Sequence, residues 1–182
     1  MRTAYLDIET SYLGRLPFPD LCRDYKNHSI TIIGIRIVEG AGDSFLQLVG
    51  KDITKSRLMH ALEGVERIVT YNGRSVRDAV KGHVGFDFPV IAAQLGVVLD
   101  KVFAHTDLCP ECWKAGLYGG QKEVERRLQL KRTLPGKDGA WADMTWKKYD
   151  ASKDERCLNE LLIYNKEDVF MLQQIEKAIT GR

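Results

Sequence analysis

Short apolar runs, each stopped by turn-forming residues, dominate the N-terminal part of this chain of 182 residues. Runs of this kind, rich in β-branched and aromatic side chains, predict buried strands. The clearest case is residues 30–38, and the glycine-rich turn at 39–43 joins them to the next run in a predicted hairpin. The predicted strands cover residues 5–8, 30–38, 44–49, 67–71 and 101–106.

Helical patterns lie between these runs and dominate after residue 107. Thr54 has the side chain of an N-cap and predicts a short helix after it. Residues 88–95 predict another helix, opened by Asp87. Residues 153–178 carry apolar side chains at helical spacing, which predicts one long amphipathic helix or a pair of them. Residues 13–27, which include two prolines, predict a loop.

This order of elements predicts an α/β fold. A hairpin, further strands alternating with helices, and a helical C-terminal part imply a mixed sheet of about five strands flanked by α-helices. We find no internal repeat, low-complexity tract or linker. We therefore expect a single domain over residues 1–182.

Composition narrows the class of protein. Hydrophobic residues make up 44% and charged residues 29%, as in ordinary globular proteins, and no run approaches the ~20 apolar residues of a membrane helix. The N-terminus lacks the features of a secretory signal, so we expect a cytoplasmic protein without a membrane partner. The four cysteines, too few for a disulfide scaffold, predict reduced thiols: Cys22, Cys109, Cys112 and Cys157.

The formal charge of +2 by itself predicts no nucleic-acid partner, but the basic residues are unevenly distributed. One short segment holds Lys122, Arg126, Arg127, Lys131, Arg132 and Lys137. Such a run is typical of a solvated helix face, and it is also compatible with contacts to a phosphate backbone. Both interpretations stay open at this point.

Two acidic residues lie at the end of the first predicted strand. Side chains alternate along a strand, so Asp7 and Glu9 project from one face while Ile8 points to the other. Two carboxylates side by side on a buried strand repel each other unless a cation lies between them. The alternative is a strand end that emerges into solvent.

Two further acidic positions have structural alternatives. Asp87, before a proline-containing first turn, is a good helix N-cap. Tyr164 and Asp168 are four residues apart on the last predicted helix and share one face. A partly buried tyrosine explains Tyr164 well, whereas Asp168 is flanked by Leu161, Val169 and Leu172, which a solvated role does not explain.

A pair of cysteines suggests a different metal site. Cys109 and Cys112 form a Cys-x-x-Cys motif, with His105 one turn upstream and Cys157 or His83 as a fourth candidate ligand for zinc. Because a second Cys-x-x-Cys pair is missing, ordinary cysteines at the start of a helix are the favoured interpretation.

Taken together, the acidic segments resemble the three motifs of the DEDD superfamily of 3′–5′ exonucleases, in the branch that carries a tyrosine (DEDDy). The motifs are Asp7-x-Glu9, Asn72-Gly73 followed by Phe86-Asp87-x-Pro89, and Tyr164-x-x-x-Asp168. The chain is most similar to bacterial predicted RNase H-like exonucleases, which also share His105-Thr106-Asp107-Leu108 and Gly119-Gly120-Gln121-Lys122. The similarity runs from about residue 5 to residue 172.

The resemblance implies a ribonuclease-H-like fold and two-metal-ion hydrolysis of DNA or RNA from single-stranded 3′ ends. Asp7, Glu9, Asp87 and Asp168 would hold two divalent cations, Mg²⁺ or Mn²⁺, and Tyr164 would orient the attacking water. Candidate substrate contacts are Asn72, Lys122 and Arg126. Alternatives are an endonuclease with the same metal site or a non-catalytic module that binds nucleic acid or protein.

The spacing within the second motif departs from the family pattern. Residues 74–85 lengthen the usual short interval between Asn-Gly and Phe-Asp. Asp78, inside this insert, is a rival for the position that we assign to Asp87. The residues around Asp87, namely Phe86, Pro89 and Ile91, favour Asp87 because they also fit the motif.

Overall fold

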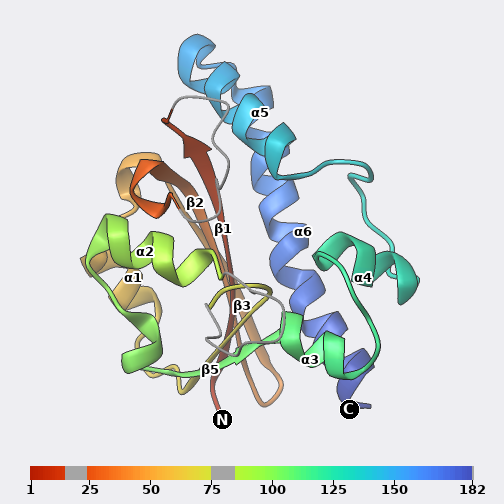
Figure 1. Ribbon diagram of the computed structural model, residues 1–182. Helices are drawn as coiled ribbons and strands as arrows, with labels where there is room; N and C mark the ends of the chain where they lie inside the picture. The colour runs from red at the N-terminus through yellow and green to blue at the C-terminus, as the bar shows by residue number, and fades with distance from the viewer. Residues whose placement is uncertain (15–23, 75–84, 182) are drawn as a thin grey trace.

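The computed structural model describes residues 1–14, 24–74 and 85–181, and a five-stranded sheet runs through its centre (Figure 1). The strand order is β3-β2-β1-β4-β5. Strands β1, β2 and β3 are antiparallel, whereas β4 and β5 run parallel to β1, so the predicted mixed sheet is confirmed. The strands are β1 (Thr3–Tyr12), β2 (His28–Glu39), β3 (Gly42–Val49), β4 (Arg67–Thr70) and β5 (Ala104–Asp107).

The central strand β1 is longer than its apolar run predicted. The polar residues after Ile8 stay in the sheet, and Tyr12 still pairs with His28. The register shifts between Glu9 and Thr10, so the strand carries an irregularity next to its acidic pair. Bulges of this kind change the direction of side chains at functional sites. The alternative in which Asp7 and Glu9 mark a strand end in solvent is therefore wrong.

Strand β2 is buried on both faces. Ile32 and Ile33 point to opposite faces of the sheet, and both are fully buried. The predicted hairpin joins β2 to β3 through a tight turn in which Gly40 has a φ of +57°. A strand that is apolar on both faces requires helices on both faces of the sheet.

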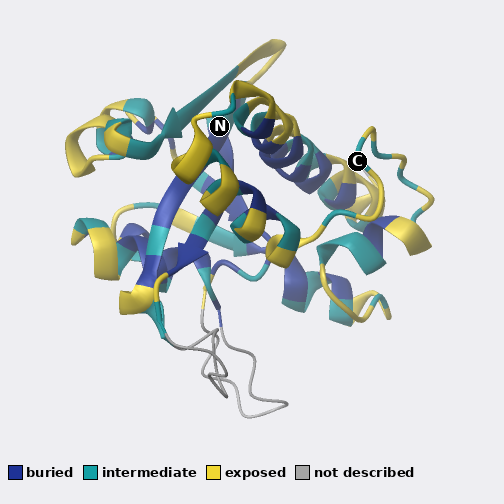
Figure 2. Ribbon diagram, turned by 90° about the horizontal axis from the view of Figure 1, so that it is seen from above, coloured by how far each residue is buried: buried dark blue, intermediate teal, exposed yellow. Residues whose placement is uncertain are grey.

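The helices provide those two layers (Figure 1), with α1 and α2 on one face and the remaining helices on the other. Seen from above, buried residues concentrate on the strands and on the helix faces turned toward them (Figure 2). The helices are α1 (Lys55–Ala61), α2 (Asp87–Leu95), α3 (Leu108–Lys114), α4 (Gln121–Arg127), α5 (Gly139–Ser152) and α6 (Glu155–Thr180). No helix in the described ranges combines the length and the apolar character that would carry it across a bilayer.

Most predicted boundaries agree with the structure to within a few residues. Thr54 is the N-cap of α1, where its hydroxyl accepts a hydrogen bond from the Arg57 amide. The strand predicted at 101–106 begins later, because Leu99–Lys101 form a short 3-10 helix. Tyr25–Asn27 form another such turn at the end of the predicted loop. The C-terminal pattern forms one helix, α6, of 26 residues.

A glycine allows α6 to pack closely on the sheet. A Cβ built on Gly34 of β2 would lie 2.8 Å from Val169 Cγ2 and closer still to Asn165 Oδ1. Only a glycine fits at this point without displacing the helix. Gly34 pairs with Asp7 across the β1–β2 ladder, so the closest approach of α6 lies beside the acidic pair.

Candidate metal centre

Three carboxylates from opposite ends of the chain meet between β1 and α6. Asp7, Glu9 and Asp168 each offer one oxygen, and these oxygens all lie within 4.8 Å of one another. Glu9 and Asp168 are only 6% and 5% exposed, and Asp7 is partly buried. The strand periodicity brings the first two together, and the close packing of α6 at Gly34 brings Asp168 to them.

A buried asparagine links the two elements. Asn165 donates from Nδ2 to Asp7 Oδ2 at 3.0 Å, and its Oδ1 accepts from Gln47 at 2.9 Å. Asn165 is fully buried, so its amide needs both partners. The motifs found in the sequence do not include this residue. The signal was present, because Asn165 is a polar residue on the apolar face of α6.

Asp87 lies at the start of α2 and does not act as its cap. The N-cap position belongs to Phe86, which makes no side-chain capping bond, so the interpretation of Asp87 as an N-cap is wrong. Asp87 is 5% exposed, and its Oδ2 has no hydrogen-bond partner within the described ranges. Glu9 Oε1 is in the same situation. Two buried carboxylate oxygens without donors call for a cation or a proton.

The carboxyl groups of this centre influence one another electrostatically. Burial, reinforced by the charge of neighbouring carboxylates, raises the pKa of Asp7, Glu9 and Asp87 well above the ordinary values. For Asp87, the neighbouring charges are those of Asp7, Asp107 and Asp168, which places it within electrostatic reach of the other acids. Shifts in this direction favour the protonated carboxyl groups, and a bound cation would favour the ionised ones.

The insert leaves the second motif intact. The Phe86 amide donates to Asn72 O at 2.8 Å, and the Phe88 amide donates to Gly73 O at 2.9 Å, so both ends of the insert lie side by side. Asn72 has a φ of +63°, which turns the chain sharply at this point. The rival Asp78 lies outside the described residues.

Asp107 holds this junction to the end of β5. Its carboxylate accepts from the Asn72 amide at 2.8 Å, from the Arg74 amide at 3.1 Å, and from the Cys109 amide at 3.0 Å as the cap of α3. Asp107 of the His-Thr-Asp-Leu segment therefore has a structural role, because it holds the turn that precedes Asp87.

Tyr164 is enclosed beside the carboxylates. It is 1% exposed, and its hydroxyl accepts a hydrogen bond of 2.6 Å from Lys122 Nζ. The same Nζ lies 3.4 Å from both oxygens of Asp168. Burial, followed by the charge of Asp168, raises the pKa of Tyr164 far above that of a free phenol. The hydroxyl therefore keeps its proton and can orient a neighbouring group, but it is a poor base.

The basic segment divides into two parts. Arg126 and Arg127 both pair with Glu123, and the Arg126 side chain is 72% exposed, as expected for a solvated helix face. Lys122 and Arg132 point inward to Asp168. The solvated-face interpretation is therefore wrong for Lys122 and Arg132, which lie within the acidic centre itself.

Among the described residues, the cysteine pair belongs to no group of three candidate zinc ligands. Cys109 and Cys112 are buried in the core, and burial raises the pKa of these thiols to about 12 and about 11. Within residues 1–14, 24–74 and 85–181, the only group of three metal-ligating side chains is Asp7, Glu9 and Asp168. His83 lies outside these ranges.

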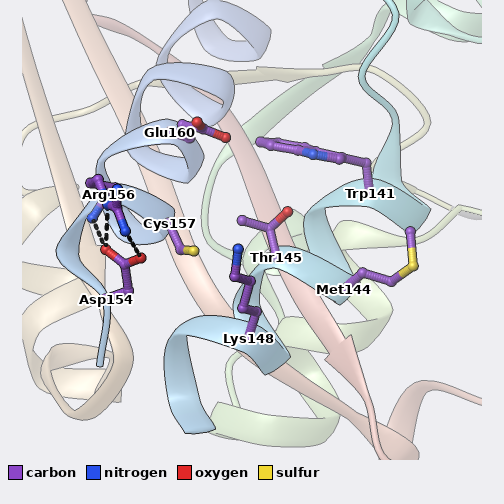
Figure 3. Close-up of a pocket in the computed structure, with 8 residues that line it drawn as sticks. All are labelled: Trp141, Met144, Thr145, Lys148, Asp154, Arg156, Cys157 and Glu160. Carbon is purple, nitrogen blue, oxygen red and sulfur yellow. Dashed lines mark hydrogen bonds and ion pairs between the residues drawn. The ribbon is translucent and has the colours of Figure 1, made fainter. Parts of the chain in front are cut away.

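A pocket of about 470 Å³ lies between α5 and the first turns of α6 (Figure 3). Pockets that bind small molecules have volumes of roughly 300–1,000 Å³. One wall is the ring of Trp141, whose centroid is 5.4 Å from that of Tyr164. The lining residues are Trp141, Met144, Thr145, Lys148, Asp154, Arg156, Cys157 and Glu160.

Comparison with known proteins agrees with this arrangement at the level of a superfamily. Residues 4–180 match the family model described as RNase_H superfamily. A comparison with curated proteins finds no match.

Proposed function

Since the chain belongs to the RNase_H superfamily, we propose that it is a metal-dependent 3′–5′ exonuclease of the DEDDy type. The convergence of Asp7, Glu9 and Asp168 within 4.8 Å is the observation that carries this proposal. The proposed substrates are the 3′ ends of single-stranded DNA or RNA.

The residues fit a pair of divalent cations. Every donor is a carboxylate oxygen, the type of ligand that Mg²⁺ and Mn²⁺ prefer. Glu9 Oε1 and Asp87 Oδ2 are buried without a partner within the described ranges, which supports a role as ligands. Asp7 and Asp168 would complete the set. Burial, and then repulsion among the carboxylates, raises the pKa of Asp7, Glu9 and Asp87, and bound cations would offset both effects.

Bound cations would supply an activated water and stabilise the charge on the phosphoryl and leaving oxygens. The side chains of this chain then orient the reacting groups. The Tyr164 hydroxyl accepts a hydrogen bond from Lys122, so its own proton remains free to be donated to the attacking water or to a phosphate oxygen. In this role Tyr164 orients the nucleophile without being deprotonated.

Lys122 is the first candidate to contact the substrate phosphate. Its ammonium lies beside Asp168 and Tyr164, and its side chain is still 37% exposed. An ammonium at this position would stabilise negative charge on a non-bridging oxygen. Arg126, which is exposed on the same helix, and Asn72, at the turn before Asp87, are proposed as more distant contacts.

Tyr164 supports the exonuclease type, because it shares one face of α6 with Asp168 and Lys122 Nζ links its hydroxyl to the Asp168 carboxylate. An endonuclease would use the same acidic centre, and a binding module would not need it to be complete. One experiment distinguishes the endonuclease and the binding module from the exonuclease.

The test uses 5′-labelled single-stranded DNA and RNA oligonucleotides with Mg²⁺, Mn²⁺ or EDTA. Asp7→Ala removes a proposed ligand, and Asp52→Ala, at an exposed site, is the matched control. We expect metal-dependent shortening from the 3′ end that Asp7→Ala abolishes and Asp52→Ala retains. Cleavage of circular single strands would instead indicate an endonuclease. Binding without cleavage in either metal would indicate a non-catalytic module.

A further inference from the structure

An arginine and a glutamate form a buried pair next to the acidic centre. Arg132 donates from Nε and Nη2 to the two carboxylate oxygens of Glu125, at 2.5 and 2.6 Å. Their side chains are only 8% and 3% exposed. The same Nη2 also donates to Asp168 Oδ1. Arg132 therefore connects Glu125, which lies on α4, with a proposed metal ligand on α6.

A second connection runs parallel to the first. Gln121 donates from Nε2 to Glu125 at 2.9 Å and to the main-chain oxygen of Asp168 at 2.9 Å. Glu125 is thus held by an amide and a guanidinium, and each of them also contacts Asp168. This double contact attaches α4 to α6 at the turn that carries Asp168 (Figure 1).

The arrangement has a consequence for charge. A guanidinium that contacted Asp168 alone would neutralise the carboxylate and compete with cations for it. Here both Nε and Nη2 of Arg132 donate to Glu125, so a carboxylate outside the group of three shares the charge of the guanidinium with Asp168. Asp168 receives one hydrogen bond from the guanidinium, whereas Glu125 receives two.

We propose that Glu125 and Arg132 are a positioning pair that holds Asp168 in place, and that Glu125 offsets part of the charge of Arg132, so that the guanidinium competes less with a divalent cation for Asp168. This inference rests on the proposed metal centre. Glu125 is not itself a ligand in this arrangement. Its function is to offset the charge of Arg132, which orients the ligand.

The test is titration of the purified full chain with Mn²⁺, followed by calorimetry or by the electron paramagnetic resonance of free Mn²⁺. Glu125→Gln keeps the shape of the side chain and removes its charge, which leaves Arg132 balanced by Asp168 alone. We expect its Mn²⁺ affinity to fall by about 10-fold to 100-fold, the usual range for partners of metal ligands. Glu123→Gln is the matched control, because it makes the same change at a partly exposed position of the same helix.

The double variant Glu125→Gln/Arg132→Gln separates charge from packing. It removes both charges and keeps groups able to hydrogen bond, so we expect its affinity to return close to that of the wild type. A purely structural role would leave the double variant at least as weak as Glu125→Gln. Melting curves without metal establish that each variant is folded. If Glu125→Gln does not fold, the test is the Mn²⁺ affinity of the double variant compared with that of the wild type.

Two results would overturn the inference. One is a Glu125→Gln variant that binds Mn²⁺ as tightly as the wild type does. The other is a folded double variant whose affinity stays far below that of the wild type. Failure of the proposed metal centre looks different, because then the wild type and Asp168→Asn would bind Mn²⁺ equally weakly.

Discussion

Gly34→Ala tests whether the packing of α6 on the sheet assembles the centre. The new methyl group would lie 2.8 Å from Val169 Cγ2, whereas carbon atoms pack best at roughly 3.5–4.0 Å, so the helix must move by about 0.7–1.2 Å. Asn165 cannot simply rotate away, because hydrogen bonds to Gln47 and Asp7 hold both ends of its amide. The displacement would therefore carry Asp168 away from the carboxylates of β1.

The expected magnitudes follow from this displacement. Overpacking of a core costs about 1–3 kcal/mol, which for a protein of this size lowers Tm by about 2–12 °C and leaves it folded at 25 °C. A misplacement of about 1 Å at a catalytic centre can lower kcat by about 10²-fold. We expect Mn²⁺ affinity to fall as well.

The assay combines thermal melting, Mn²⁺ titration and cleavage of a labelled oligonucleotide. Gly139→Ala is the control, because a Cβ at that position on α5 meets no atom within 4 Å. If Gly34→Ala melts, binds Mn²⁺ and cleaves as the wild type does, the close approach of α6 is not what holds Asp168 in place, and the reasoning fails.

Three further variants test single groups of the centre. Burial, and then the charges of Asp7 and Asp168, raise the pKa of Glu9. The folded chain therefore keeps a proton on Glu9 that the unfolded chain releases. As a result, the stability of the metal-free protein falls as pH rises above about 4.5. Glu9→Gln removes this loss, so the Tm of the metal-free variant, relative to that of the wild type, should increase as pH rises. A Tm difference that does not change with pH would contradict this. Tyr164→Phe should lower kcat by about 10²-fold and leave Mn²⁺ affinity unchanged, since the hydroxyl orients the nucleophile and binds no metal; an equal loss of affinity would place the hydroxyl among the ligands. Lys122→Met should raise KM more than Arg126→Gln does, because Lys122 lies at the centre and Arg126 is exposed; equal effects would show that the phosphate binds along the outer face of α4.

Much of the fold followed from local patterns. The hairpin of β2 and β3, the cap at Thr54 and the length of α6 depend on side-chain periodicity and on residues next to each other in the chain. The same periodicity indicated that Asp7 and Glu9 share a face, and that Tyr164 and Asp168 do so on a helix. Periodicity fixes such relations within one element, whatever that element packs against.

Contacts between elements were not predictable in this way. The charges of Lys122, Arg126 and Arg132 look alike in the sequence, and only the packing of α4 against α6 turns Lys122 and Arg132 inward and leaves Arg126 in solvent. Arg132 lies beyond the end of α4, so no helical spacing relates it to Glu125.

The sequence alone therefore determined the elements and the acidic faces that they carry. The tertiary structure decided which faces meet. It brings Phe86 back to Asn72 across the insert, so that Asp87 lies close to the other acids. It also brings α6 against β2 at Gly34 and so unites Asp168 with Asp7. The physical reason is that a side chain's orientation is a local property, whereas its burial and its electrostatic partners depend on residues far away in the chain.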